Sequence, residues 1–276
     1  MTARLDGQVV LITGSTAGIG RAMAERFAGA GASVVVTGRS VGKGEAVRDA
    51  IVARGGNALY VAMDIGEEDQ VRAAVEAAEK HFGKLTGLVN NAATIQGRRD
   101  GPITEIETAD WLDILRVDLT GTYFALKYGL RAVARAGGGS VVNISSAAGV
   151  RGQIGNNGYA ACKGAIQALT RSLAVYYSRY LIRVNCLVVG TIDTGEGKLK
   201  QLLESLETGP KLIQHYLGRV GRPEEVADAA AFLLSDEASF INGVELPVDN
   251  GATMKGHAIN APRDMAGVPP PANAWV

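Results

Sequence analysis

The chain has 276 residues, which suits one α/β domain with a substantial core, and its 28 basic residues are balanced by 28 acidic ones. This balance argues against nucleic-acid and membrane partners, because both need a basic surface. No apolar stretch approaches the roughly 18 residues of a membrane-spanning helix, and the first residues lack a signal-peptide core, so we expect a cytoplasmic protein. Two cysteines, Cys162 and Cys186, and three scattered histidines predict neither a disulfide framework nor a metal site.

Strand-like and helix-like segments alternate along the chain. In order, the pattern predicts a strand at 8–13, a helix at 18–30, a strand at 33–37, a helix at 43–54, a strand at 58–62, a helix at 67–82, a strand at 85–89, a helix at 108–135, a strand at 140–144, a helix at 158–180, a strand at 182–188, a helix at 223–234 and a strand at 244–248. Continuous apolar strands separated by helices are typical of a parallel sheet covered on both faces. We therefore predict a single-domain, doubly wound α/β fold.

The domain is expected to span residues 1–256. Residues 195–222 are polar, glycine-containing and less regular, which favours a mobile flap over the site. The leucines of this flap fit an amphipathic lid as well as a lipophilic substrate pocket, and the sequence leaves both open. Residues 257–276 are rich in proline and glycine and are expected to form an extended arm or a frayed tail.

A glycine-rich segment, Thr-Gly-Ser-Thr-Ala-Gly-Ile-Gly at 13–20, joins the first predicted strand to the first predicted helix. Its glycines permit a tight turn and a close backbone approach to a pyrophosphate. The helix that follows offers unpaired N–H groups and the positive end of its dipole. Its place between strand and helix predicts a dinucleotide site, built from Gly14, Ser15, Thr16, Gly18, Ile19 and Gly20.

The end of the second predicted strand bears on the choice of cofactor. A site that prefers NAD usually has Asp or Glu there, to accept hydrogen bonds from the ribose hydroxyls. This strand ends in Val-Thr-Gly-Arg-Ser, without a carboxylate. Arg39 can bind a 2′-phosphate through charge-assisted hydrogen bonds, so we predict NADP(H) as the preferred cofactor. If Arg39 is only a solvated loop charge, NAD(H) is accepted as well.

Tyr159 and Lys163 are four residues apart, and on a helix their side chains share one face. A free phenol, with a pKa of about 10, is a poor base at neutral pH. A neighbouring ammonium favours the phenolate by Coulomb attraction. Tyr159 is therefore expected to give a proton to a ketone oxygen, or take one from an alcohol, as a hydride moves.

The ordered set of motifs resembles the short-chain dehydrogenase/reductase family, in its compact single-domain type, over residues 5–251. The resemblance implies a Rossmann fold. The matching motifs are TGxxxGIG at 13–20, Asp64-Ile65, NNAA at 90–93 against the family's NNAG, Ser146 at the usual distance before the tyrosine, YxxxK at 159–163, and Gly-Arg-Pro-Glu-Glu-Val-Ala at 221–227.

The resemblance also implies roles for single residues. Ser146 would hydrogen-bond the substrate oxygen, Tyr159 would be the general acid/base, and Lys163 would hold the nicotinamide ribose and favour the phenolate. Ser145 is one residue too far from Tyr159 and is read as a structural hydroxyl. The remaining cofactor contacts would come from Asp64 and Ile65 at the adenine, from Asn91 and Ala92 near the ribose, and from Gly190, Thr191 and Ile192 at the nicotinamide.

Four positions depart from the family pattern: Asp118, Val189, Ala93 and Asn250. Asp118 stands where the family has an Asn that completes a proton relay. An ionised Asp accepts hydrogen bonds but cannot donate them. Two interpretations follow. Either the changes are drift in a working enzyme, with Asp118 as a relay residue, or they indicate unusual pH behaviour or slow turnover.

The predicted function is interconversion of a secondary alcohol and a ketone, with a lipophilic or cyclic small molecule as substrate. One alternative is reduction of a 3-oxoacyl thioester on a carrier protein, which the neutral charge balance does not support. A second is a catalytically weak, NADP-binding regulatory protein. Similar proteins commonly assemble through the two long helices, so we expect a homotetramer or homodimer.

Overall fold

The computed structural model describes residues 4–94, 100–152, 155–195 and 219–254. These residues form a seven-stranded parallel sheet in the order β3-β2-β1-β4-β5-β6-β7. The strands are β1 (Val9–Ile12), β2 (Ser33–Gly38), β3 (Asn57–Ala62), β4 (Gly87–Asn90), β5 (Gly139–Ser146), β6 (Ile182–Val189) and β7 (Glu245–Val248). The predicted doubly wound α/β fold is confirmed.

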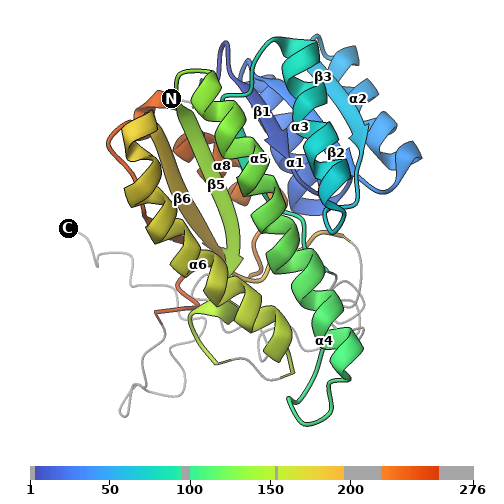
Figure 1. The fold of residues 1–276 in the computed structure, drawn as a ribbon, viewed down its shortest axis with the longest axis vertical. Helices are drawn as coiled ribbons and strands as arrows, with labels where there is room; N and C mark the ends of the chain where they lie inside the picture. Colours follow the sequence, from blue (N-terminus) through green and yellow to red (C-terminus); the bar gives the residue numbers. More distant parts are fainter. Residues whose placement is uncertain (1–3, 95–99, 153–154, 196–218, 255–276) are drawn as a thin grey trace, which may run out of the picture.

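Helices cover both faces of the sheet, and Figure 1 shows α5 and α6 crossing in front of the strands. One face is covered by α1 (Gly18–Gly29), α2 (Val41–Ala53) and α8 (Pro223–Leu234), and the other by α3 (Glu68–Phe82), α5 (Gly121–Arg135) and α6 (Asn157–Tyr177). Successive side chains of a strand point to opposite faces. Along β1, Val10 and Ile12 therefore join the first core, while Val9 and Leu11 join the second. Burial on both faces explains why the strands read as continuous apolar runs.

The helix predicted at 108–135 is present, but it is not α-helical throughout. It begins as α4 (Thr108–Ile114), passes through a π-helical segment, η1 (Leu115–Thr120), and continues as α5. A π-turn accommodates one extra residue, and the extra residue cannot be read from a helical apolar pattern. The Thr122 hydroxyl also donates to the Asp118 carbonyl at 2.8 Å, inside this segment. The other predicted elements differ from the structure only at their ends.

The order in which successive strands join the sheet reverses between β1 and β4, because β1 pairs with β2 on one side and with β4 on the other, both in parallel. In doubly wound sheets, ligands bind beyond the carboxyl ends of the strands at such a switch point. The glycine-rich segment follows β1 and the predicted catalytic serine ends β5. The fold therefore gathers the predicted site at one edge of the sheet. Among the described helices, none is long and apolar enough to cross a membrane.

Buried amides tie the middle of the sheet to α6. Asn90 Nδ2 donates to Asn143 Oδ1 at 2.8 Å, linking β4 to β5. Asn143 Nδ2 donates to Thr170 Oγ1 at 2.9 Å, linking β5 to α6. The Thr170 hydroxyl in turn donates to the Ile166 carbonyl at 2.8 Å. Asn143 is the central member of this set of hydrogen bonds, because it is bonded to both Asn90 and Thr170. It is also fully buried.

Replacing Asn143 with Ala should lower the free energy of unfolding by about 2–4 kcal/mol, because two hydrogen bonds are lost and buried partners are left unpaired. Urea unfolding followed by circular dichroism measures this change. Asn57→Ala, at an exposed position in β3, is the control and should change stability little. Equal stability of the Asn143 variant and the wild-type chain would show that these buried hydrogen bonds make no net contribution to the free energy of unfolding.

Candidate active site

The predicted catalytic side chains meet at the carboxyl edge of β5. Tyr159 and Lys163 lie on α6, and Ser146 is the last residue of β5. The Lys163 ammonium lies 5.4 Å from the centre of the Tyr159 ring and donates to the Ile144 carbonyl at 2.9 Å. Lys163 is only 2% exposed, whereas Tyr159 and Ser146 are half-buried and reachable from solvent. The structure thus places the buried Lys163 cation beside the Tyr159 ring, and Ser146 at the end of the strand to which Lys163 is bonded.

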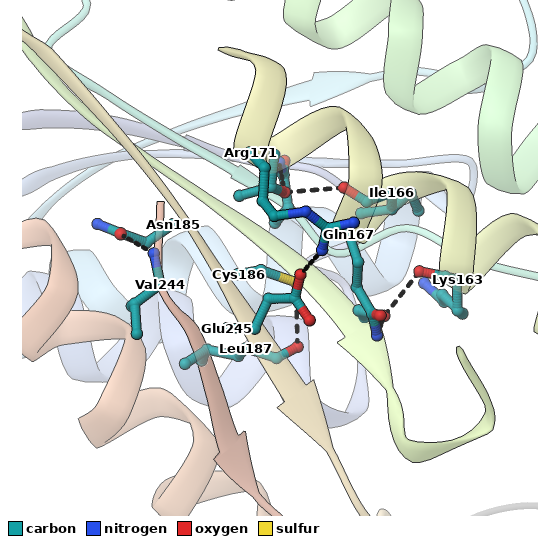
Figure 2. Close-up of polar contacts among 12 residues, drawn as sticks. Lys163, Ile166, Gln167, Arg171, Asn185, Cys186, Leu187, Val244 and Glu245 are labelled. Atoms are coloured by element: carbon teal, nitrogen blue, oxygen red, sulfur yellow. Dashed lines mark hydrogen bonds and ion pairs between the residues drawn. The ribbon is translucent and has the colours of Figure 1, made fainter. Parts of the chain in front are cut away.

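A second layer of hydrogen bonds fixes the turn of α6 that carries Lys163. The Ser145 hydroxyl donates to the Lys163 carbonyl at 2.9 Å, and Gln167 Nε2 donates to Ser145 Oγ at 2.8 Å. Figure 2 shows Gln167 and Lys163 on neighbouring turns of this helix. Ser145 therefore holds α6 against β5, as the interpretation of its hydroxyl as structural requires. Ser146 Oγ accepts a hydrogen bond from Ala148 N at 3.2 Å.

Asp118 is fully buried within η1. Its Oδ1 accepts from Thr94 N at 2.6 Å, whereas Oδ2 has no hydrogen-bond partner among the described residues. Burial raises the pKa of this carboxyl above its ordinary value, and the charge of Asp100 adds to the effect. The Lys163 charge and the Thr94 N–H oppose it without cancelling it. The carboxyl that replaces the family's Asn therefore interacts electrostatically with Lys163.

The glycine-rich loop is compact because its glycines allow close backbone contacts. Gly14 has φ +65° and Gly18 φ +52°, the left-handed region that glycine adopts readily. A Cβ on Gly14 would lie 2.9 Å from Ala92 Cα, and one on Gly20 would overlap the Gly14 carbonyl oxygen. The helix α1 begins without a side-chain cap and without an acidic residue in its first turn. An uncapped helix start behind a glycine loop fits a dinucleotide pyrophosphate.

Two of the predicted cofactor residues direct their side chains into the loop itself. Asn91 Nδ2 donates to the carbonyls of Thr13 and Gly14, both at 3.0 Å. The Ser15 hydroxyl is buried, donates to the Ile12 carbonyl at 2.8 Å and accepts from Thr37 N at 2.9 Å. These two side chains therefore hold the loop in shape. Sequence patterns alone do not distinguish this structural role from direct contact with a ligand.

The adenosine end of the predicted site lies at the carboxyl ends of β2 and β3. Arg39 is exposed directly after β2. A Cβ on Gly38 would lie 2.7 Å from Thr16 Cγ2, so the missing side chain lets the glycine-rich loop approach β2. After β3, Asp64 Oδ1 accepts from Gly66 N at 2.9 Å and Ile65 is buried.

The predicted nicotinamide end follows β6. A Cβ on Gly190 would lie 2.7 Å from Asp249 Cα, so glycine is needed where this segment crosses the end of β7. Thr191 is exposed and Ile192 is buried. Asn250 has φ +54°, which explains why a glycine suits the family pattern at this position and why Asn is tolerated. A cavity of about 220 Å³ opens here, lined by Thr191, Ile192, Arg219, Gly221, Glu225, Pro247, Val248, Asp249 and Asn250.

Sequence reasoning missed Asp100 and Gln167. Asp100 accepts hydrogen bonds from the backbone at the start of α6, and no sequence signal links it to a helix so far along the chain. Gln167 lies one helical turn after Lys163. This spacing was the only sequence signal that it could support the turn carrying Lys163. Most of the predicted flap (196–218) and the predicted tail (257–276) lie outside the described residues.

The raised pKa of Asp118 predicts a pH-dependent stability. Below the ordinary Asp pKa the carboxyl is neutral in both states, so its burial is not penalised. As the pH rises through the higher folded-state pKa, the ionised form destabilises the native chain. Asp118→Asn should therefore melt above the wild-type chain at about pH 8, and the difference should shrink toward about pH 4. Scanning calorimetry at both pH values measures this, and a pH-independent difference would contradict it.

Comparisons with known proteins identify the family of this chain. The family model described as Enoyl-(Acyl carrier protein) reductase matches residues 14–253. The chain is 38% identical to 2-(S)-hydroxypropyl-CoM dehydrogenase 3 of Xanthobacter autotrophicus, over 92% of this chain and 99% of that protein. It is 36% identical to cyclohexanol dehydrogenase of an Acinetobacter species, over 92% and 98%.

Among solved structures, the gluconate 5-dehydrogenase of Burkholderia cenocepacia, in complex with NADP and tartrate, superposes with a TM-score of 0.84 at 33% identity. The match covers 92% of this chain and 98% of that one. The long family match, the near full-length relatives and the shared fold lead to one conclusion. The chain belongs to the short-chain dehydrogenase/reductase family of oxidoreductases.

Proposed function

We propose that this chain interconverts a secondary alcohol and a ketone, using NADP(H) in preference to NAD(H), with Tyr159 as the general acid/base. One observation carries the proposal. The half-buried Tyr159 phenol lies beside the buried Lys163 ammonium, at the same sheet edge as an uncapped helix start and a glycine loop. A proton donor and a dinucleotide site at one edge are what a carbonyl reduction requires.

When bound, the nicotinamide ring supplies a hydride to the carbonyl carbon, or takes one from the alcohol carbon. The chain's own residues handle the oxygen. In reduction, Ser146 Oγ donates a hydrogen bond to the carbonyl oxygen and Tyr159 gives it a proton, which leaves a phenolate. Lys163 stabilises that phenolate by Coulomb attraction, and its contact with Ile144 keeps it in place. In oxidation, the phenolate takes the proton from the alcohol.

The cofactor would be held along the carboxyl edge of the sheet. Its pyrophosphate would lie on the start of α1, its ribose 2′-phosphate at Arg39, and its nicotinamide near Lys163. The other proposed contacts are Gly14, Ser15, Thr16, Gly18, Ile19, Gly20, Asp64, Ile65, Asn91, Ala92, Gly190, Thr191 and Ile192. For Ser15 and Asn91 the contact would come from the backbone, because their side chains bond the loop.

The proposed substrate is a small lipophilic or cyclic alcohol or ketone. The relative named cyclohexanol dehydrogenase supports a cyclic alcohol, and the relative named 2-(S)-hydroxypropyl-CoM dehydrogenase supports a secondary alcohol. Arg39, exposed where a NAD-preferring site has a carboxylate, supports NADP. A solved neighbour described with NADP supports it further.

We propose a domain spanning residues 1–256 with a flap at about 195–222, a cytoplasmic location, and assembly as a homotetramer or homodimer. Exposed apolar side chains on the two long helices support an association through them. Tyr123 of α5 is 49% exposed, and Val175 and Tyr176 of α6 are 79% and 54% exposed.

Tyr159→Phe should lower kcat for NADPH-dependent ketone reduction by about 10²- to 10⁴-fold, because the proton donor is lost. NADPH affinity, measured by fluorescence titration, should stay close to that of the wild-type chain. The assay follows NADPH oxidation against a panel of linear and cyclic ketones. Tyr176→Phe, at an exposed position of the same helix, is the matched control and should keep full activity.

Undiminished turnover by Tyr159→Phe would contradict the proposed role. Tight NADPH binding without turnover in the wild-type chain would favour the regulatory alternative, and activity confined to acyl thioesters would favour the carrier-protein alternative.

Arg39→Ala should weaken NADPH binding by on the order of 10- to 100-fold, the effect of losing a charge-assisted contact to the 2′-phosphate. NADH binding should change little, since NADH lacks that phosphate. Isothermal titration with both cofactors measures the two affinities. Arg48→Ala, which removes a guanidinium of α2 bonded to Asp49, serves as control. Equal losses for NADPH and NADH would refute the role of Arg39.

A further inference from the structure

A carboxylate from a distant part of the chain lies on the first turn of α6. Asp100 precedes α4 in the chain, yet its Oδ2 accepts from Tyr159 N at 2.8 Å. Its Oδ1 accepts from Gly158 N at 3.0 Å and from Gly101 N at 3.0 Å. One half-buried side chain therefore binds two of the backbone N–H groups at the start of the helix that carries the candidate acid/base.

The helix α6 has no cap of its own. Asn156 precedes it with φ −138° and ψ 53° and makes no side-chain capping hydrogen bond, and the first turn contains no acidic residue. Unpaired N–H groups and the positive end of the helix dipole favour a carboxylate at this place. Asp100 supplies that carboxylate from outside the helix.

The contact is reciprocal. Asn157 Nδ2, at the start of α6, donates to the Gly101 carbonyl at 2.6 Å. We call these five residues, Asp100, Gly101, Asn157, Gly158 and Tyr159, the Asp100 clamp. Four hydrogen bonds make up the clamp, and three of them join its two segments.

Packing against α4 brings the two halves of the clamp together. Gly158 is buried, and a Cβ there would lie 3.1 Å from Ile114 Cδ1 of α4. The same Cβ would lie 3.6 Å from Asp100 Oδ1. Because position 158 has no side chain, the start of α6 can lie close to α4 and to the Asp100 carboxylate.

The clamp fixes the residue on which the proposed chemistry depends. Lys163 is held to β5 through Ile144 and Ser145, whereas Tyr159 is in the first turn of α6, which frays most readily in a helix without a cap. A shift of about 1 Å in a reacting group costs on the order of 10²-fold in rate. We propose that Asp100 is a positioning residue: it caps α6 from outside and holds the Tyr159 phenol in register with Lys163 and Ser146. This inference rests on the proposed function of Tyr159.

The test compares the two ends of one helix. Asp100→Ala removes the cap at the start of α6. Asn242→Ala is the matched control, since Asn242 Nδ2 donates to the Ala174 carbonyl near the end of α6 at 3.0 Å, and Asn242 Oδ1 accepts from Val184 N at 2.9 Å. Both variants lose side-chain hydrogen bonds to backbone groups, so both should lower Tm.

Only Asp100→Ala should lower kcat, by about 10- to 100-fold, with NADPH affinity unchanged because the glycine-rich loop is untouched. Its backbone amides at 158–159 should exchange hydrogen faster, as measured by mass spectrometry of the peptide that covers the start of α6. Asp100→Asn keeps one acceptor oxygen in place of two and should give an intermediate kcat, a graded rescue that a purely structural role does not predict.

Two results would overturn the inference. The first is unchanged amide exchange at 158–159 in Asp100→Ala, because the carboxylate would then not cap the helix. The second is a loss of kcat that follows Tm equally in the Asp100 and Asn242 variants, because the effect would then be general destabilisation. A wild-type chain without Tyr159-dependent turnover would instead defeat the proposed function, and with it the positioning of Tyr159, while amide exchange would still decide whether Asp100 caps α6.

Discussion

The buried ammonium of Lys163 is the constraint on which the site depends. A charge removed from water is costly unless it is hydrogen-bonded or paired, and Lys163 is 2% exposed with the Ile144 carbonyl as its hydrogen-bond acceptor. That contact fastens α6 to the end of β5. Ser145 and Gln167 reinforce the same turn, so the cation is held beside Tyr159 by a rigid strand and a rigid helix.

Around this cation the proposed site has two parts, one for the cofactor and one for the reaction. The cofactor part depends on missing side chains: Gly14 and Gly20 let the loop close on itself and leave the start of α1 uncovered. The reaction part depends on charges. The charges of Asp118 and Lys163 interact, and burial holds the pKa of Asp118 above its ordinary value. A single sheet edge serves both parts because β1 and β5 end on the same side of the parallel sheet.

The sequence was sufficient where the determining residues are neighbours in the chain. The glycine pattern and the Tyr159–Lys163 spacing are local, so strand–turn–helix and helical geometry predicted where they lie. The π-helical segment around Asp118 was not predicted, because an extra residue in one turn leaves the apolar spacing nearly unchanged. The cap on Gly158 was not predicted either, since Asp100 lies 58 residues away in the chain and reaches Gly158 through the tertiary packing around α4 and α6.

In the proposed reaction, the Lys163 cation drives the proton transfer of Tyr159. Lys163→Met tests it most directly, because it removes the buried charge and keeps a side chain of similar length. The measurement is the single-turnover rate of NADPH oxidation, with cofactor and ketone both saturating. The rate for Lys163→Met should be about 10²- to 10⁴-fold below that of the wild-type chain, with the fold retained. A rate equal to that of the wild-type chain would contradict it.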